Sequence, residues 1–256
     1  MRIPSYDELL QRTPPGSSWG VFGPGDELGT ANFLTAERVS AASRLIRTGR
    51  CFGLDHPVTA FEPYPTGTRR ALRHEVFSNN EWHRDDWVDS FYLQSSSQID
   101  ALRHIGHPEH GFYNGLSSAE NSPESVALGV HAYAESGLAG RGVLLDLPRY
   151  FARHGLPYDA TATTAVGPEM LDEMAAEQGV EWEGGELLML RTGWAEQYLG
   201  QTEAERARIP WRRSPGLAQR EEVVRWLWDH HIPPLSSDNL SLEPHSLLER
   251  EVLAQG

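Results

Sequence analysis

The chain has 256 residues, of which 39% are apolar and 23% are charged, values typical of a soluble globular protein with a full hydrophobic core. Its formal net charge of −14 argues against nucleic acids and anionic membranes as partners. The single cysteine, Cys51, excludes an internal disulfide and fits a reducing cytosol. Because the chain also lacks an apolar run of roughly 18 residues and a signal-peptide pattern at its start, we expect a cytoplasmic protein.

Residues 1–34 are rich in Gly, Pro and Ser and are expected to be mostly loop. Thr35 is predicted to cap a helix over residues 36–48, which ends at Gly49. A strand is expected over residues 51–54, with Cys51 as a small core residue.

Residues 60–90 are polar, aromatic and interrupted by proline, so they are predicted to form a long loop with one strand near residues 74–77. Such a loop in a compact domain often covers a site. Trp82 is therefore a candidate for lining a substrate pocket. An equal alternative is that the aromatic side chains anchor the loop.

Apolar periodicity and Gly or Pro boundaries predict helices and strands in alternation through the second half of the chain. Helices are expected over residues 123–137, 168–178 and 217–230. Strands are expected over residues 142–147 and 186–191, and a third leads into Asp238. No change of composition separates these elements, which indicates one mixed α/β domain.

The stretch from Gln94 to His104 concentrates two amides, one carboxylate and one imidazole in eleven residues. In a strand, Gln98 and Asp100 would point the same way, with Cα atoms roughly 7 Å apart. A bend at the three serines after Gln94 would bring that amide to the same point. One carboxylate with two amides suits Mg, Mn or Ca better than Zn on softness alone, and a histidine can accept a proton near neutral pH. The alternative is a turn-capping Asp100 beside a solvated His104.

This spacing resembles the metal-site signature of the cyclase family of metal-dependent hydrolases, His-x-Gly-Thr-His-x-Asp-Ala-x-x-His. Gln94 and Gln98 stand where the family has two ligand histidines, Asp100 matches the ligand aspartate, and His104 matches the catalytic histidine. The Gln-x-x-x-Gln-x-Asp-x-x-x-His form resembles the branch that contains trans-dienelactone hydrolase. Other members are kynurenine formamidase and isatin hydrolase. The resemblance favours Zn or Mn as the bound metal.

The resemblance also implies a fold, a swivelling β/β/α arrangement with a β-barrel-like core flanked by helices. It implies a single domain over residues 1–256, in which residues 1–34 cover the site and the family's last strands are absent. His245 stands where the family has a histidine that often reaches the metal, and Arg191 opens a turn that recurs beside the site. Relatives are usually homo-oligomers, so we expect the same here.

Tyr113 and Asn114 follow the central stretch and are candidates for contacting substrate, although a plain turn at Asn-Gly is an equal alternative. The resemblance implies hydrolysis of a small-molecule substrate, a cyclic ester or amide or an aryl formamide, with His104 as general base. Two alternatives stay open. One is elimination or dehydration at the same site, and the other is a non-catalytic or truncated family member.

Overall fold

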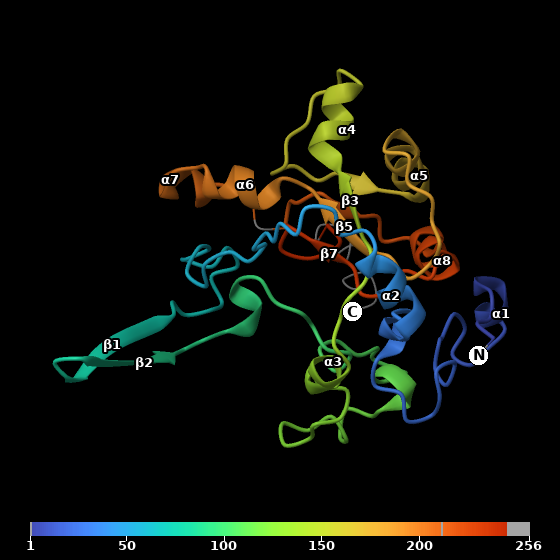
Figure 1. The fold of residues 1–256 in the computed structure, drawn as a ribbon, viewed down its shortest axis with the longest axis horizontal. Coiled ribbons are helices and arrows are strands. Elements are labelled where there is room, and N and C mark those ends of the chain that lie inside the picture. The colour runs from blue at the N-terminus through green and yellow to red at the C-terminus, as the bar shows by residue number, and fades with distance from the viewer. Residues whose placement is uncertain (1, 211, 245–256) are drawn as a thin grey trace.

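The computed structural model describes residues 2–210 and 212–244. The protein is mixed α/β, as predicted, and its strands form three separate small sheets (Figure 1). Within the described residues these sheets do not close into a barrel. In the same part of the chain, no helix combines the length and the apolar character needed to cross a membrane.

The central sheet has three parallel strands in the order β3-β5-β7. β3 spans Gly142–Asp146, β5 spans Leu187–Arg191 and β7 spans Ser236–Ser237. A second parallel pair joins β4 (Ala165–Val166) to β6 (Gly216–Leu217). The main core contains side chains of β3, β4, β5 and β6 and of helices α5 (Pro168–Glu177) and α8 (Glu221–Asp229).

The predictions from residue 142 onward agree with these elements, with two corrections. Residues 216–217 form strand β6, so the predicted helix begins later, at Glu221. The strand predicted over residues 142–147 ends at Asp146, because Leu147 already begins helix α4 (Leu147–Arg153), which has Pro148 in its first turn, where proline is tolerated. Asp146 caps this helix by accepting a hydrogen bond from the Arg149 backbone N–H at 3.0 Å. Two shorter helices, α6 (Trp194–Leu199) and α7 (Glu203–Arg206), follow β5.

The first half of the chain departs further from the predictions. Helix α2 spans only Ala36–Ser43, and none of its residues is buried. Residues 51–54 are irregular, and Cys51 is exposed rather than part of a core. The predicted helix over 123–137 is reduced to α3 (His131–Ser136), because Leu128 has a positive φ of 56° that a helix cannot accommodate.

The segment before α2, expected to be loop, contains helix α1 (Tyr6–Leu10) and the 3-10 turn η1 (Gly29–Phe33). Tyr6 and Leu9 pack with Phe33 and Trp228 in a second core cluster. The Trp228 indole N–H donates to the Pro4 carbonyl at 2.8 Å, which fixes the segment to α8. Three remaining elements are the 3-10 turns η2 (Leu93–Ser95) and η3 (Tyr113–Gly115) and an antiparallel hairpin of β1 (Arg73–Asn80) and β2 (His83–Asp89).

Strand β3 offers a matched test of the core, because Leu145 is fully buried while its neighbour Leu144 is 48% exposed. Leu145→Ala is expected to lower the free energy of unfolding by about 2–5 kcal/mol, since it removes buried methyl groups and leaves a cavity. Leu144→Ala should cost well under half as much. Urea denaturation of the two variants measures this difference in the free energy of unfolding. Equal losses from the two substitutions would contradict the burial of Leu145 and the exposure of Leu144 on opposite faces of β3.

Candidate functional site

Three side chains surround the carboxylate of Asp100. The Gln94 Nε2 lies 3.4 Å from Asp100 Oδ1, and the Gln98 Nε2 lies 3.3 Å from Oδ2. The His104 Nε2 lies 3.8 Å from Oδ1. The structure therefore brings together the four residues that the sequence pattern singled out.

The backbone that achieves this is not the expected strand. Gln94 lies in the 3-10 turn η2, the chain bends at Ser96 and Ser97, and residues 98–100 are irregular. A turn then presents His104, whose backbone N–H donates to the Ala101 carbonyl at 2.9 Å. The predicted bend after Gln94 is present, whereas the predicted strand through Gln98 and Asp100 is wrong.

Contacts with distant segments hold this loop in place. The Ser96 hydroxyl donates to the His56 carbonyl at 3.2 Å, and the Ser97 hydroxyl accepts from the His56 backbone N–H at 3.0 Å. The Arg69 guanidinium donates to the backbone carbonyl of Gln94. The serines therefore anchor the loop through their hydroxyl groups, in addition to allowing it to bend.

The donor set fits a divalent cation. Ligand atoms about 2.0–2.2 Å from a tetrahedral ion are separated by about 3.4 Å, close to the 3.4 and 3.3 Å between the two glutamine amides and the Asp100 carboxylate. Rotating either glutamine amide by half a turn exchanges its nitrogen for an oxygen, the amide atom that a cation would bind. Within the described residues no group of three or more His, Cys, Asp or Glu side chains is placed to hold a metal ion, and the Asp100 centre contains only two side chains of these types.

The side chains of Asp100 and His104 are each 42% exposed, so the centre is open to a small molecule from solvent. This openness also means that surrounding water screens the charge of Asp100. His245, the remaining residue expected at the metal, lies outside the described residues.

Tyr113 and Asn114 contact the N-terminal segment. The Tyr113 hydroxyl donates to Asp26 Oδ2 at 2.8 Å, and burial together with the Asp26 carboxylate raises the pKa of Tyr113. Asn114, at a φ of 54°, accepts from the Gly20 backbone N–H and donates to the Asp26 carbonyl. Their polar groups hold residues 20–26 against η3, a role that the sequence did not indicate.

Trp82 lies in the turn between β1 and β2, at the tip of a hairpin that projects from the body of the protein (Figure 1). It is 88% exposed. The hairpin tip and the Asp100 loop are separated by the whole length of β2. Trp82 therefore lies apart from the Asp100 centre within one chain.

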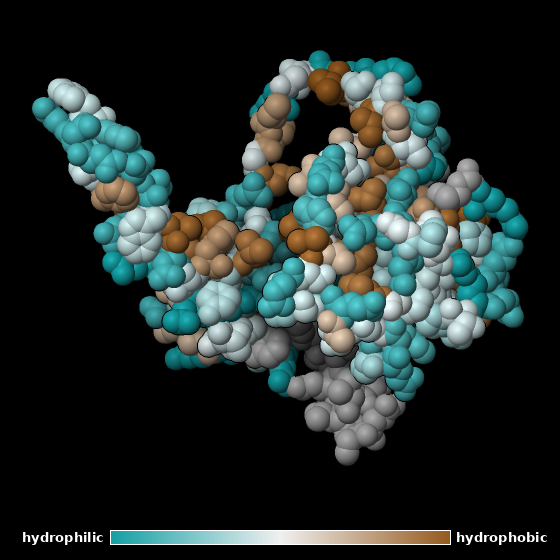
Figure 2. All heavy atoms as spheres, turned by 90° about the horizontal axis from the view of Figure 1, so that it is seen from below, coloured by the Kyte–Doolittle hydropathy of each residue, from teal (hydrophilic) through white to brown (hydrophobic). Residues whose placement is uncertain are grey.

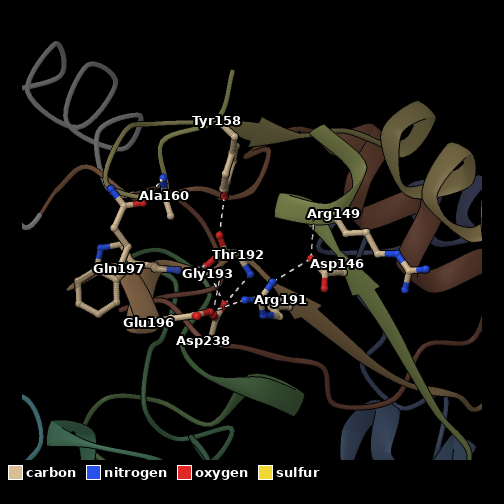
Figure 3. A network of polar contacts seen from close by, with 11 residues as sticks. Asp146, Arg149, Tyr158, Ala160, Arg191, Thr192, Gly193, Glu196, Gln197 and Asp238 are labelled. Carbon is tan, nitrogen blue, oxygen red and sulfur yellow. Dashed lines mark hydrogen bonds and ion pairs between the residues drawn. The ribbon is translucent and has the colours of Figure 1, made fainter. Parts of the chain in front are cut away.

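Arg191 belongs to a second polar group, at the carboxyl ends of the three central strands (Figure 3). Its guanidinium pairs with Asp146 Oδ1 at 3.0 Å and with Glu196. Burial acts to lower the pKa of Arg191, but Asp146 and Glu196 outweigh it and raise the pKa. The sequence prediction included Arg191 but missed Asp146, although an acidic residue directly after a buried strand marks the edge where open α/β sheets bind ligands.

Asp238 directly follows β7 and lies at the same carboxyl edge of the central sheet. Its Oδ1 accepts hydrogen bonds from the backbone N–H and hydroxyl of Thr192, and its Oδ2 accepts from the Gly193 N–H at 2.8 Å (Figure 3). The Tyr158 hydroxyl donates to the Thr192 carbonyl at 2.6 Å. Asp238 thus ties β7 to the end of β5.

Phe61 links the two polar regions. Its ring stacks on Trp194 of α6 with centroids 6.0 Å apart, and it makes an edge contact of 5.3 Å with His56. His56 in turn holds the serines of the Asp100 loop. A continuous set of contacts therefore runs from the Asp100 centre to the helix that follows β5.

The protein is therefore a mixed α/β protein with a centre of two amides, one carboxylate and one imidazole. The model of the cyclase family matches residues 52–244, which include the whole Gln94–His104 stretch. The chain belongs to this cyclase family. A crystal structure described as that of a novel cyclase is similar to it with a TM-score of 0.76 and 28% identity, over 91% of this chain and 80% of that chain. No curated protein matches the chain.

Proposed function

We propose that this chain is a metal-dependent hydrolase that opens a small cyclic ester or amide, or cleaves an aryl formamide. The observation that carries the proposal is the convergence of Gln94, Gln98 and His104 on the Asp100 carboxylate. Membership of the cyclase family supports an enzymatic role.

Gln94, Gln98 and Asp100 would hold the metal, through two amide oxygens and one carboxylate. Zn or Mn is the ion that the family resemblance favours. When bound, such an ion polarises a carbonyl group and lowers the pKa of a nearby water molecule.

His104 would move the proton. It accepts the proton of the attacking water while the water oxygen forms a bond to the carbonyl carbon. It then donates that proton to the oxygen or nitrogen of the leaving group as the ester or amide bond breaks. The turn that hydrogen-bonds His104 N–H to the Ala101 carbonyl orients the ring beside Asp100.

The proposal is tested by incubating the protein with Zn²⁺ or Mn²⁺ and measuring bound metal by elemental mass spectrometry, together with a screen of lactones, cyclic amides and formamides. We expect near-stoichiometric metal and products heavier than the cyclic substrates by one water. His104→Gln should keep the metal and lose activity by about 100-fold or more, because proton transfer is worth that much. Absence of metal, or products that have lost water, would contradict hydrolysis at this centre.

A further inference from the structure

Two segments meet where the β1–β2 hairpin leaves the body of the protein (Figures 1 and 2). Residues 61–72 lead into β1, and residues 90–95 follow β2 and contain Gln94. The last pair of the hairpin at this end, Arg73↔Asp89, sets the two segments beside each other. Side chains of both segments line one hollow. The hairpin therefore brings residues 61–72 against the turn η2, which carries a proposed metal ligand.

The segment 61–72 forms a loop that is tied at both ends. The Leu72 backbone N–H donates to Glu62 Oε1 at 2.7 Å, which closes the loop. At the start of the loop, Phe61 stacks on Trp194 with ring centroids 6.0 Å apart, and Trp194 is buried. The loop is therefore connected to the body of the protein through α6 and can hold a neighbouring segment in place.

Arg69 is the side chain of this loop that reaches η2. Its guanidinium carbon lies 4.1 Å from the centre of the Tyr64 ring, and one of its N–H groups donates to the Gln94 carbonyl. Because the guanidinium group is planar, its face can stack on the ring while its edge donates the hydrogen bond. A lysine ammonium has no such face and cannot make both contacts in one geometry.

Gln94 needs an external support of this kind. Its turn η2 has only three residues, and so short a turn has too few hydrogen bonds to offset the loss of backbone freedom. The Gln94 amide must nevertheless stay beside the Asp100 carboxylate, where its Nε2 lies 3.4 Å from Oδ1. A metal site requires its ligands to be held within about 0.5 Å of the productive geometry.

We propose that Arg69 is a positioning residue of the metal centre, which fixes the backbone of Gln94 so that the amide stays beside Asp100. The inference rests on the proposed function, since Gln94 is a metal ligand there. The hydrogen bond to the Gln94 carbonyl is charge-assisted, and such bonds are about twice as strong as neutral ones. Loss of Arg69 therefore frees η2 to move and spreads Gln94 over positions that cannot bind the metal.

The first test is the dissociation constant for Mn²⁺, measured by isothermal titration calorimetry on the full chain. Arg69→Ala is expected to weaken binding by about 10- to 100-fold, the range for residues that orient a ligand. Arg69→Lys should recover little of this loss. Arg70→Ala is the matched control, because it removes the same charge from the next residue, which is exposed and makes no hydrogen bond or ion pair within the described part of the chain. It should bind Mn²⁺ like wild type.

Tyr64 gives a second test that leaves Arg69 in place. Tyr64→Phe keeps the aromatic face and should bind Mn²⁺ like wild type. Tyr64→Leu removes that face and should weaken binding by about 2- to 5-fold, the factor that corresponds to a cation–π contact at an exposed site. Equal binding by the two variants would contradict the role of the stacked ring in orienting the guanidinium group.

The third test needs no metal and follows amide hydrogen exchange by NMR in the metal-free protein. The Ser95 backbone N–H donates to the Tyr92 carbonyl at 3.0 Å, so its exchange reports on opening of η2. Exchange should be about 10-fold faster or more in Arg69→Ala, the factor that loss of a charge-assisted hydrogen bond gives. It should be unchanged in Arg70→Ala.

The two kinds of measurement separate this proposal from the proposed function. A wild type that binds no Mn²⁺ contradicts the metal-dependent function, and faster Ser95 exchange in Arg69→Ala then still supports the hold of Arg69 on η2. A wild type that binds Mn²⁺, with an Arg69→Ala variant that binds it equally well, overturns the positioning role. Equal Ser95 exchange in the two alanine variants overturns that role as well.

Discussion

Asp100→Ala is expected to abolish both metal retention and turnover. The carboxylate is the group around which Gln94, Gln98 and His104 gather, and it is the one charged group among the three described residues that we propose as ligands. Two neutral amides bind a divalent cation weakly without it. Removal of a residue that only hydrogen-bonds to a ligand lowers metal affinity by about 10- to 100-fold. Because Asp100 is itself the proposed charged ligand, we expect its removal to lower metal affinity by more than about 100-fold.

The measurement is metal content after dialysis, made in parallel with hydrolysis of the best substrate from the screen. Glu124→Gln serves as the control, because it removes one negative charge from an exposed position of the same acidic protein. It should leave metal content and rate unchanged. Full activity in Asp100→Ala would show that the chemistry occurs elsewhere.

Asp238→Ala is expected to destabilise the whole domain, by about 3–5 kcal/mol. The substitution leaves the Thr192 N–H, the Thr192 hydroxyl and the Gly193 N–H without their shared acceptor, and Thr192 is fully buried. A buried donor without an acceptor is destabilising by its full desolvation free energy, because no hydrogen bond in the protein replaces the one it made to water. For a chain of this size the loss corresponds to a fall in Tm of about 10 °C.

Thermal unfolding followed by circular dichroism measures this effect. Asp238→Asn keeps one carbonyl acceptor and should lose less than the alanine variant. Glu135→Gln, at an exposed position of α3, should stay within about 0.5 kcal/mol of wild type. An Asp238→Ala protein as stable as wild type would mean that the strand ends do not depend on this carboxylate.

The two polar regions differ in what their carboxylates do. Both oxygens of Asp238 accept hydrogen bonds from backbone N–H groups or a hydroxyl, and Asp146 Oδ1 accepts from a backbone N–H and the Arg191 guanidinium. Asp100 has only long contacts of 3.3 to 3.8 Å with two amides and an imidazole. The first arrangement stabilises the fold, whereas the second leaves a carboxylate available to a ligand.

Features that depend on near neighbours in the chain were predictable from the sequence. Helix α5 begins at Pro168 and ends before Gly179. Strands β3 and β5 are short apolar runs in which alternate residues are buried. The four residues of the Asp100 centre were also predictable, because they lie within eleven positions and a bend at the serines suffices to bring them together.

Features that depend on distant contacts required the tertiary structure. Residues 51–54 have a strand-like composition but gain no strand partner, so they stay irregular and Cys51 is exposed. Tyr113 and Asn114 are candidate substrate contacts or plain turn residues in the sequence, and the structure shows that Asp26 and Gly20 engage their polar groups. Trp82 is a candidate pocket residue or loop anchor in the sequence, but the pairing of β1 with β2 places it at the tip of the hairpin.

The sequence by itself therefore determined the alternating helices and strands of the second half and the donor set of the Asp100 centre, because both arise from the order of side chains over a few turns of backbone. Only the tertiary structure decided how that centre is anchored. The partners of its loop, His56 and Arg69, lie about 25 to 40 residues earlier in the chain. Hydrogen bonds across such a separation form only after the intervening chain has folded, and no local pattern of residues encodes them.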